Sequence, residues 1–257
     1  MSQPQVPAAP PGAAVGSEVP WRPLEALAAF LLASGVTLVL VAAVSAIAVT
    51  VAAPPRLINA ALIPLTPLSF AAVTLALVRR RHPDALRRLW GRRPARLRDV
   101  RTGLWVGLGG YVVFGFGLGA LAQAIVAATG RELPVLQEAF VEAAAEPATA
   151  VLLVLSAVVL APVGEELFYR GLLYQGLRAR WGSAPAMWLS AAVFAVTHVN
   201  LAGPALAGVL LVVVILPLGV LLAWSFERTG SLIVPIVAHA LFNAVQVLLL
   251  LLAPAAL

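Results

Sequence analysis

The chain has 257 residues, of which 61% are hydrophobic and 11% are charged, and its formal net charge is +6 at pH 7. A typical soluble domain is about 45–50% apolar and about 25% charged. So few polar groups would leave the surface of a water-soluble fold uncovered, so the composition favours a polytopic membrane protein. The chain contains no cysteine, which excludes disulfides, a thiol nucleophile and cysteine-ligated zinc.

The positive charge is concentrated in one segment. Every basic residue is an arginine, and ten of the 17 arginines lie in residues 79–101, between two apolar runs. A basic loop beside membrane spans indicates the cytoplasmic side, with anionic lipid as its neighbour, so nucleic acid is not an expected partner. The exclusive use of arginine is typical of a GC-rich bacterial gene, and we therefore expect a multi-pass protein of the bacterial inner membrane.

The N-terminal half predicts a tail and three spans. Residues 1–20 are rich in proline, alanine and glycine, which predicts a disordered tail without a cleavable signal. Apolar runs long enough to cross a bilayer follow at about 24–53 and 57–78. After the arginine-rich segment, a third predicted span covers about 102–128.

The C-terminal half predicts four more spans, which begin at about residue 148 and then cover about 184–199, 205–226 and 231–252. Together these elements predict an all-α transmembrane helix bundle of seven spans, or of eight if the region around Pro217 forms two short spans. We expect one transmembrane domain over residues 21–257. The positive-inside rule places the N-terminus and residues 79–101 in the cytoplasm, and the acidic connection at 129–146 outside.

Ionisable residues inside the predicted spans are few. Such residues usually face the bundle interior, where they are paired or functional. The predicted spans contain five such residues: Glu165, Glu166, Arg170, His198 and His239. Asn243 follows His239 by one helical turn.

The spacing of these residues predicts that they meet. Glu165 and His198 each lie 16 to 17 residues from a predicted turn at 181–182, so both are about 25 Å from it. His239 and Asn243 lie about 14 and 20 Å from the next turn and share one helix face. Glu166 and Arg170 are four residues apart, which allows an ion pair across one turn.

The chemistry available to such a cluster is hydrolysis. A carboxylate beside an imidazole can activate water as a general base, and a second imidazole with an amide can stabilise an oxyanion. Glutamate with two histidines is also a ligand set that zinc accepts. The spans contain no aspartate pair, and the chain has no HExxH or GxSxG motif, which excludes several other protease types.

Each residue also has a structural interpretation. Glu166 and Arg170 can form a pair that only joins helices, and a histidine within a span can be a hydrogen-bonded core residue. Asn243 can make an interhelical hydrogen bond. The joint occurrence of Glu165, His198, His239 and Asn243 at similar depth favours a functional site.

Three motifs in order resemble those of a known family. The sequence "EELFYR" at 165–170 resembles EExxxR, "FAVTH" at 194–198 resembles FxxxH, and "HALFN" at 239–243 resembles HxxxN. These motifs are typical of the CPBP family of intramembrane proteases, which includes CAAX proteases and bacteriocin-processing proteins. The resemblance covers about residues 147–250, the expected catalytic core.

The resemblance implies a role for each matching residue. Glu165 would activate water, and His198 would help to hold it. His239 and Asn243 would stabilise the oxyanion, while Glu166 and Arg170 would support the geometry. If zinc is the cofactor, Glu165, His198 and His239 would be its ligands, as in a metalloprotease.

The expected function is therefore an intramembrane endopeptidase that hydrolyses peptide bonds of membrane-associated peptides or proteins, with membrane lipids around it. One alternative is a proton-coupled transporter in which the same residues relay protons; it predicts pseudo-symmetric halves, and no internal repeat is visible. The other alternative is a non-catalytic bacteriocin-immunity membrane protein.

Overall fold

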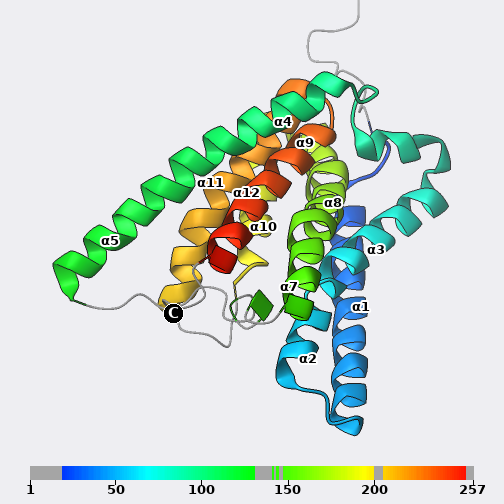
Figure 1. Ribbon diagram of the computed structural model, residues 1–257. Coiled ribbons are helices and arrows are strands. Elements are labelled where there is room, and N and C mark those ends of the chain that lie inside the picture. The colour runs from blue at the N-terminus through cyan, green and yellow to red at the C-terminus, as the bar shows by residue number, and fades with distance from the viewer. Residues whose placement is uncertain (1–18, 131–140, 142, 145–146, 200–204, 253–257) are drawn as a thin grey trace, which may run out of the picture.

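The computed structural model describes residues 19–130, 141, 143–144, 147–199 and 205–252. These residues form a bundle of helices (Figure 1), and their only β-type pairing is an isolated antiparallel bridge between Gly91 and Ser231. The predicted all-α class is confirmed. The predicted tail falls largely on residues 1–18, outside the described part of the chain. Val19, at the end of that prediction, is instead buried in the core.

The first helices form a hairpin. Helix α1 (Pro23–Thr50) begins at a proline, which suits the first turn because its missing N–H has no helical partner there. Helix α2 (Pro55–Leu62) also begins at a proline, and α3 (Leu65–Arg81) returns along α1. The chain is irregular around Pro64, as its prolines predict.

The arginine-rich segment contains a short 3₁₀ helix, η1 (Pro83–Trp90). A long helix follows without interruption as α4 (Leu97–Gly110), a π-helical stretch η2 (Tyr111–Phe116) and α5 (Gly117–Thr129). It begins five residues earlier than predicted, because Asp99 in its first turn accepts the Arg96 N–H at 2.8 Å. Its α4 portion packs against the last helix of the chain.

One continuous helix of 35 residues carries the paired glutamates. It consists of five consecutive segments: α7 (Pro147–Val154), η3 (Leu155–Leu160), α8 (Ala161–Glu166), η4 (Leu167–Tyr174) and α9 (Gln175–Trp181). Both η3 and η4 are π-helical, so wide turns flank the glutamates on either side. Gly164 lets α8 approach α3 closely, because a Cβ there would collide with the Pro67 carbonyl.

Three further helices complete the bundle. Gly182, at a positive φ of 84°, makes the turn from α9 into α10 (Ser183–Val196). Helix α11 (Ala205–Thr229) continues through Pro217 as one helix, so the alternative of two short spans there is wrong. A tight turn at Gly230 leads into α12 (Ile233–Leu252).

The predicted fifth span ends earlier than its sequence suggests. Helix α10 stops at Val196, whereas the prediction extended to residue 199. The Thr197 hydroxyl and His198 Nδ1 both lie within hydrogen-bond distance of the Phe194 carbonyl, at 2.9 and 2.7 Å. Side chains that bond nearby backbone groups compete with helix continuation.

By length and composition, five helices in the described part of the chain are able to cross a membrane: 23–50, 57–81, 147–181, 205–229 and 233–252. Helix α10 is apolar but shorter. A multi-pass membrane protein is therefore supported, whereas the count of seven to eight spans stays a prediction.

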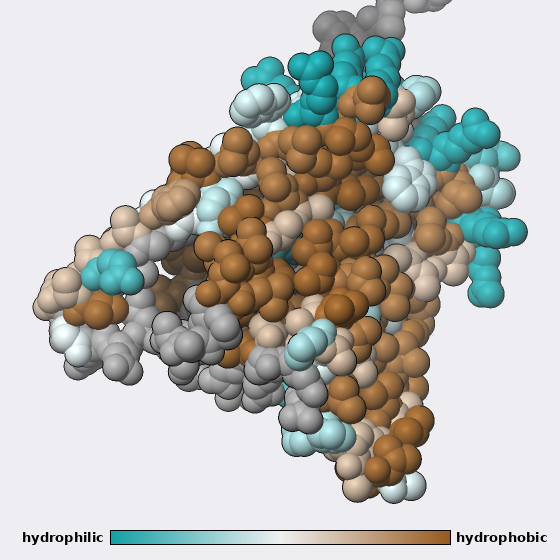
Figure 2. All heavy atoms as spheres, in the orientation of Figure 1, coloured by the Kyte–Doolittle hydropathy of each residue, from teal (hydrophilic) through white to brown (hydrophobic). Residues whose placement is uncertain are grey.

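Fourteen of the 17 arginines lie at or beside one end of the bundle, which we call the arginine face: Arg22, Arg79, Arg80, Arg81, Arg87, Arg88, Arg92, Arg93, Arg96, Arg98, Arg101, Arg178, Arg180 and Arg228. In Figure 2, hydrophilic residues gather at this end while apolar residues cover the sides of the bundle.

Ion pairs connect the arginine face internally. Glu227 Oε2 accepts hydrogen bonds from Arg92 at 2.7 Å and from Arg178 at 2.9 Å. Arg93 binds both carboxylate oxygens of Asp99, at 2.9 and 2.6 Å. The hydrogen bond from Arg93 lowers the pKa of Asp99 to about 2. Both carboxylates at this end are therefore paired with arginines.

Candidate active site

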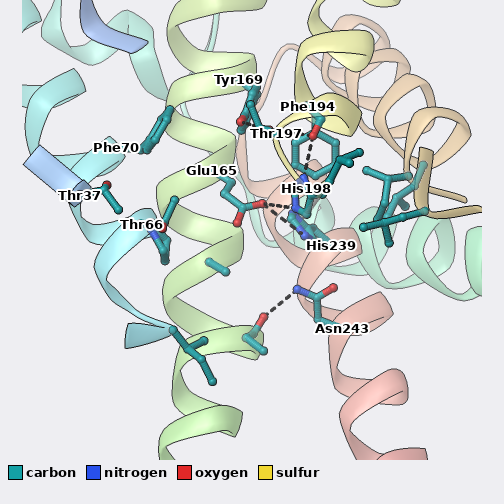
Figure 3. A pocket seen from close by; sticks show the side chains of 18 of the residues that line it. Thr37, Thr66, Phe70, Glu165, Tyr169, Phe194, Thr197, His198, His239 and Asn243 are labelled. Atoms are coloured by element: carbon teal, nitrogen blue, oxygen red, sulfur yellow. Dashed lines mark hydrogen bonds and ion pairs between the residues drawn. The ribbon is translucent and has the colours of Figure 1, made fainter. Parts of the chain in front are cut away.

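Three motif residues from separate helices meet inside the bundle (Figure 3). Glu165 lies on α8, His198 follows the end of α10, and His239 lies on α12. Glu165 Oε2 is 3.7 Å from His198 Nε2 and 3.9 Å from His239 Nε2. The sequence spacing had placed these residues at similar depth, and the structure brings them together.

The orientation of His198 is fixed by its own turn. Its Nδ1 lies 2.7 Å from the Phe194 carbonyl oxygen, and its ring packs edge-on against the Phe194 ring at 4.5 Å. A carbonyl oxygen only accepts, so Nδ1 carries the proton in this contact. The neutral ring then presents the lone pair of Nε2 to Glu165.

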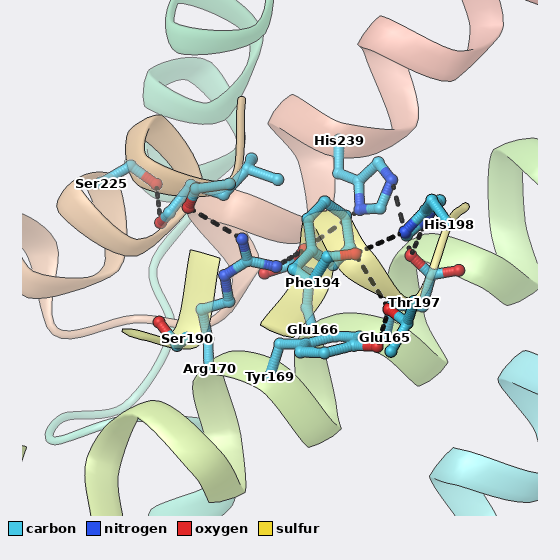
Figure 4. Close-up of polar contacts among 12 residues, drawn as sticks. Glu165, Glu166, Tyr169, Arg170, Ser190, Phe194, Thr197, His198, Ser225 and His239 are labelled. Carbon is cyan, nitrogen blue, oxygen red and sulfur yellow. Dashed lines mark hydrogen bonds and ion pairs between the residues drawn. The ribbon is translucent and has the colours of Figure 1, made fainter. Parts of the chain in front are cut away.

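The orientation of His239 is fixed by the second glutamate (Figure 4). Its Nδ1 lies 3.0 Å from Glu166 Oε1, and His239 as a whole residue is only 3% exposed. The carboxylate accepts a hydrogen bond from Nδ1–H, so Nε2 of a neutral ring also turns its lone pair towards Glu165. Glu166 thus positions a histidine, a role that the sequence did not predict.

The predicted Glu166–Arg170 pair is present and fully buried. Arg170 Nη1 donates to Glu166 Oε1 at 2.7 Å, and Nη2 donates to the Gly219 carbonyl at 2.9 Å. The guanidinium also lies over the Phe194 ring, 4.6 Å from its centroid. Arg170, Glu166 and Phe194 therefore connect the glutamate helix to α10, α11 and α12.

Glu165 and Glu166 differ in their bound oxygens, although each has a buried Oε2 without a hydrogen-bond partner among the described residues. Glu166 Oε1 is bound by Arg170 and His239, whereas Glu165 makes no hydrogen bond to a described residue and its Oε2 faces Nε2 of both histidines. A buried acceptor without a donor costs about 1–3 kcal/mol, more when it is charged. With both imidazoles in the tautomers above, these three atoms are acceptors, and a water molecule among them would supply hydrogen-bond donors.

Asn243 lies one turn beyond His239 on α12 and lines the same cavity (Figure 3). Its Nδ2 donates to the Ala157 carbonyl at 2.8 Å, across to the glutamate helix. One hydrogen of the amide is thus used for interhelical contact, and the amide has a second hydrogen.

Two residues at the site were missed by sequence reasoning. The Tyr169 hydroxyl lies 2.7 Å from Thr197 Oγ1, and Thr197 donates to the Phe194 carbonyl, which is also the partner of His198. Because Thr197 uses its hydrogen on Phe194, Tyr169 is the donor in their contact. The signal was available: Tyr169 is one turn from Glu165, and Thr197 precedes His198.

The site opens into a cavity of about 1100 Å³. Residues of α1, α2, α3, α10, α11, α12 and the glutamate helix line it, and most of them are apolar. This volume is slightly above the range of about 300–1,000 Å³ that is usual for small-molecule sites. An apolar segment of polypeptide or lipid suits such a lining.

Zinc held by Glu165, His198 and His239 is the metal site that the motifs allow. The described residues contain no group of three or more histidine, aspartate or glutamate side chains arranged to hold a metal ion. Both imidazoles approach the same oxygen of Glu165, at 3.7 and 3.9 Å. The metalloprotease interpretation therefore stays a prediction.

Comparisons with known proteins address the C-terminal part of the chain. Neither the comparison with curated proteins nor that with solved structures gave a match. Residues 147–245 match the model of a family described as type II CAAX prenyl endopeptidase Rce1-like. This segment contains all three motifs and every residue of the cluster, and the match supports assignment of this part of the chain to the CPBP/CAAX protease family.

Proposed function

We propose that the protein is an intramembrane endopeptidase in which Glu165 activates a water molecule for hydrolysis of a peptide bond. The observation that carries this proposal is the buried Glu165 Oε2, which has no hydrogen-bond partner among the described residues and faces Nε2 of both histidines. Family membership supports the protease class.

A water molecule can satisfy two of these three acceptors. It donates one hydrogen to Glu165 and the other to Nε2 of His198, which leaves its lone pairs free to attack. Glu165 takes a proton as the water oxygen bonds to the scissile carbonyl carbon. The same proton passes to the amine as the C–N bond breaks, so hydrolysis is balanced and Glu165 is regenerated.

The oxyanion formed by this attack needs donors. Nε2 of His239 receives no hydrogen from the water, and protonation of this ring would make Nε2 a donor to the oxyanion while Nδ1 remains bound to Glu166. The second amide hydrogen of Asn243 is the other candidate donor.

The substrate class follows from the cavity. Its apolar lining and its position within membrane-spanning helices suit a polypeptide segment held at the membrane. We further propose that the arginine face lies on the cytoplasmic side of a bacterial inner membrane, because fourteen arginines gather there.

The test is cleavage of a quenched-fluorescent, N-acylated peptide library by the purified protein in detergent. Glu165→Gln keeps size and shape but removes the base, so turnover falls by about 10²–10⁴-fold. Glu25→Gln is the matched control, since Glu25 is a carboxylate of α1 that does not line the cavity, and it retains turnover. Wild-type turnover in Glu165→Gln contradicts the proposal, as does a wild-type protein that cleaves nothing.

A further inference from the structure

The cavity is closed towards the arginine face by a layer of aromatic rings. Phe70 packs on Phe168 with ring centroids 4.9 Å apart, and Tyr169 packs on both Phe168 and Phe194 at 4.9 Å. These four residues are at most 5% exposed. Residues 79–101, all of which the structure describes, contribute nothing to the cavity lining. Among the described residues, this aromatic layer lies between the site and the arginine face.

The exposed lining residues lie on the other side of this layer. On α3, Phe70 is buried about 16 Å from the arginine end, whereas Thr66, about 22 Å away, is exposed. On α10, Phe194 is fully buried, and Val196, about 20 Å from the start of the helix, is 61% exposed. Among the described residues, the exposed ones that line the cavity are Leu38, Thr66, Val196, Thr197 and Gln246.

The short α10 explains why the cavity opens there. From its start at the arginine face, its 14 residues extend about 21 Å, less than the roughly 30 Å of a bilayer core. The cavity continues beyond its end to Asn59 on α2 and Leu250 near the end of α12. Both lie towards the end of the bundle opposite the arginine face.

We infer that substrates enter this cavity from the extracytoplasmic side of the membrane. The inference rests on the proposed protease function and adds the substrate class: exported polypeptides that are anchored in, or inserted from, the outer leaflet. Charge decides which side is which, since arginine-rich loops stay in the cytoplasm and the cavity extends away from them. A cytoplasmic protein would meet the closed aromatic layer and the buried Glu166–Arg170 pair instead.

Cysteine labelling tests the sidedness without relying on catalysis, because the native chain has no cysteine. Thr66→Cys places a thiol on the exposed part of the cavity, and Ala95→Cys places one on an exposed loop of the arginine face. In intact spheroplasts of a bacterial host, a membrane-impermeant maleimide labels Thr66→Cys but labels Ala95→Cys only after lysis. The reverse pattern overturns the inference, and so does a Thr66→Cys variant that stays unlabelled from both sides.

A second measurement uses activity. An N-acylated, quenched-fluorescent peptide that the protein cleaves in detergent is added outside intact spheroplasts, and the wild type cleaves it while Glu165→Gln does not. Cleavage in detergent and in inside-out vesicles but not in spheroplasts overturns the sidedness and leaves the protease function standing. Absence of cleavage in detergent contradicts the protease function, and the labelling experiment then decides the sidedness alone.

Discussion

The arginine face and the cavity hold charge in opposite ways. At the arginine face, Glu227 accepts hydrogen bonds from two arginines and from the Tyr174 hydroxyl, and Asp99 binds both arms of Arg93. In the cavity, Glu165 Oε2 is buried and has no hydrogen-bond partner among the described residues. Glu166, its neighbour in the chain, is intermediate, because Oε1 is bound by Arg170 and His239 while its buried Oε2 also has no hydrogen-bond partner among the described residues.

We propose that this difference separates structural carboxylates from the carboxylate that takes part in chemistry. A carboxylate whose acceptor sites are filled by arginine stabilises the fold and has little capacity to take a proton from water. An unpaired carboxylate in an enclosed site is energetically unfavourable, and such groups are typical of functional positions. Substitutions in the two regions should therefore affect stability and activity differently.

The largest expected effect is on stability, from breaking the buried pair. Arg170→Ala removes the ion-pair partner of Glu166 at a fully buried position and leaves His239 as its hydrogen-bond partner, so we expect a loss of about 3–5 kcal/mol in the free energy of unfolding. Arg178→Ala, at the partly exposed arginine face, should cost about 1 kcal/mol or less. Denaturant unfolding in detergent measures both, and equal losses would contradict the distinction.

A smaller effect is expected from removing one hydroxyl beside the site. Tyr169→Phe keeps the aromatic layer but breaks the contact with Thr197, whose partner carbonyl also orients His198. We expect about 1 kcal/mol less stability and a roughly tenfold lower kcat with little change in KM. Tyr174→Phe is the matched control, because it removes a hydroxyl bound to Glu227 at the arginine face. It should cost similar stability and leave kcat unchanged.

The outcome of Tyr169→Phe also separates positioning from packing. If Tyr169 acts only by packing, both tyrosine variants lower stability and neither changes kcat. The conservative variant Thr197→Ser retains a hydroxyl at that position, so we expect it to have the kcat of the wild type. A loss of activity in Thr197→Ser equal to that in Tyr169→Phe would argue against the hydroxyl contact as the cause.

Much of the fold was predictable, because a membrane leaves few choices. Only helices satisfy every backbone group of a single span in lipid, so apolar runs of about 20 residues indicate helices directly. The hairpin turn at Gly182 then fixes the relative depth of Glu165 and His198. The Glu166–Arg170 pair follows from four-residue spacing alone.

The orientation of the site was not predictable in the same way. Which glutamate binds His239 depends on helix rotation, and the π-helical turns on both sides of the glutamates change that rotation without a sequence rule. The end of α10 at Val196 depends on side-chain bonds to Phe194. The Tyr169–Thr197 contact joins two helices, so single-helix periodicity does not reveal it.

Substitution of Glu165 should lower activity without lowering stability, in contrast to substitution of Arg170. Glu165→Gln removes the unpaired buried charge, so the free energy of unfolding should stay the same or rise by about 1 kcal/mol even though turnover is lost. Glu227→Gln removes a carboxylate bound by two arginines and should lower stability by about 1 kcal/mol. Thermal unfolding in detergent distinguishes the two, and a clear destabilisation by Glu165→Gln would place Glu165 with the structural carboxylates.

The smallest expected effect is a pH dependence confined to the arginine face. Hydrogen bonding from Arg93 lowers the pKa of Asp99 to about 2, so Asp99 binds protons less readily in the folded protein than in the unfolded chain. Its contribution to stability is therefore complete above its ordinary pKa of about 4 and is lost as the pH falls from about 4 to about 2. Asp99→Asn should remove this part of the acid sensitivity, whereas Asp84→Asn, at an exposed position of η1, should retain it. Unfolding followed in detergent across that range measures the difference, and identical pH profiles for wild type and Asp99→Asn would show that the Arg93–Asp99 pair does not stabilise this face.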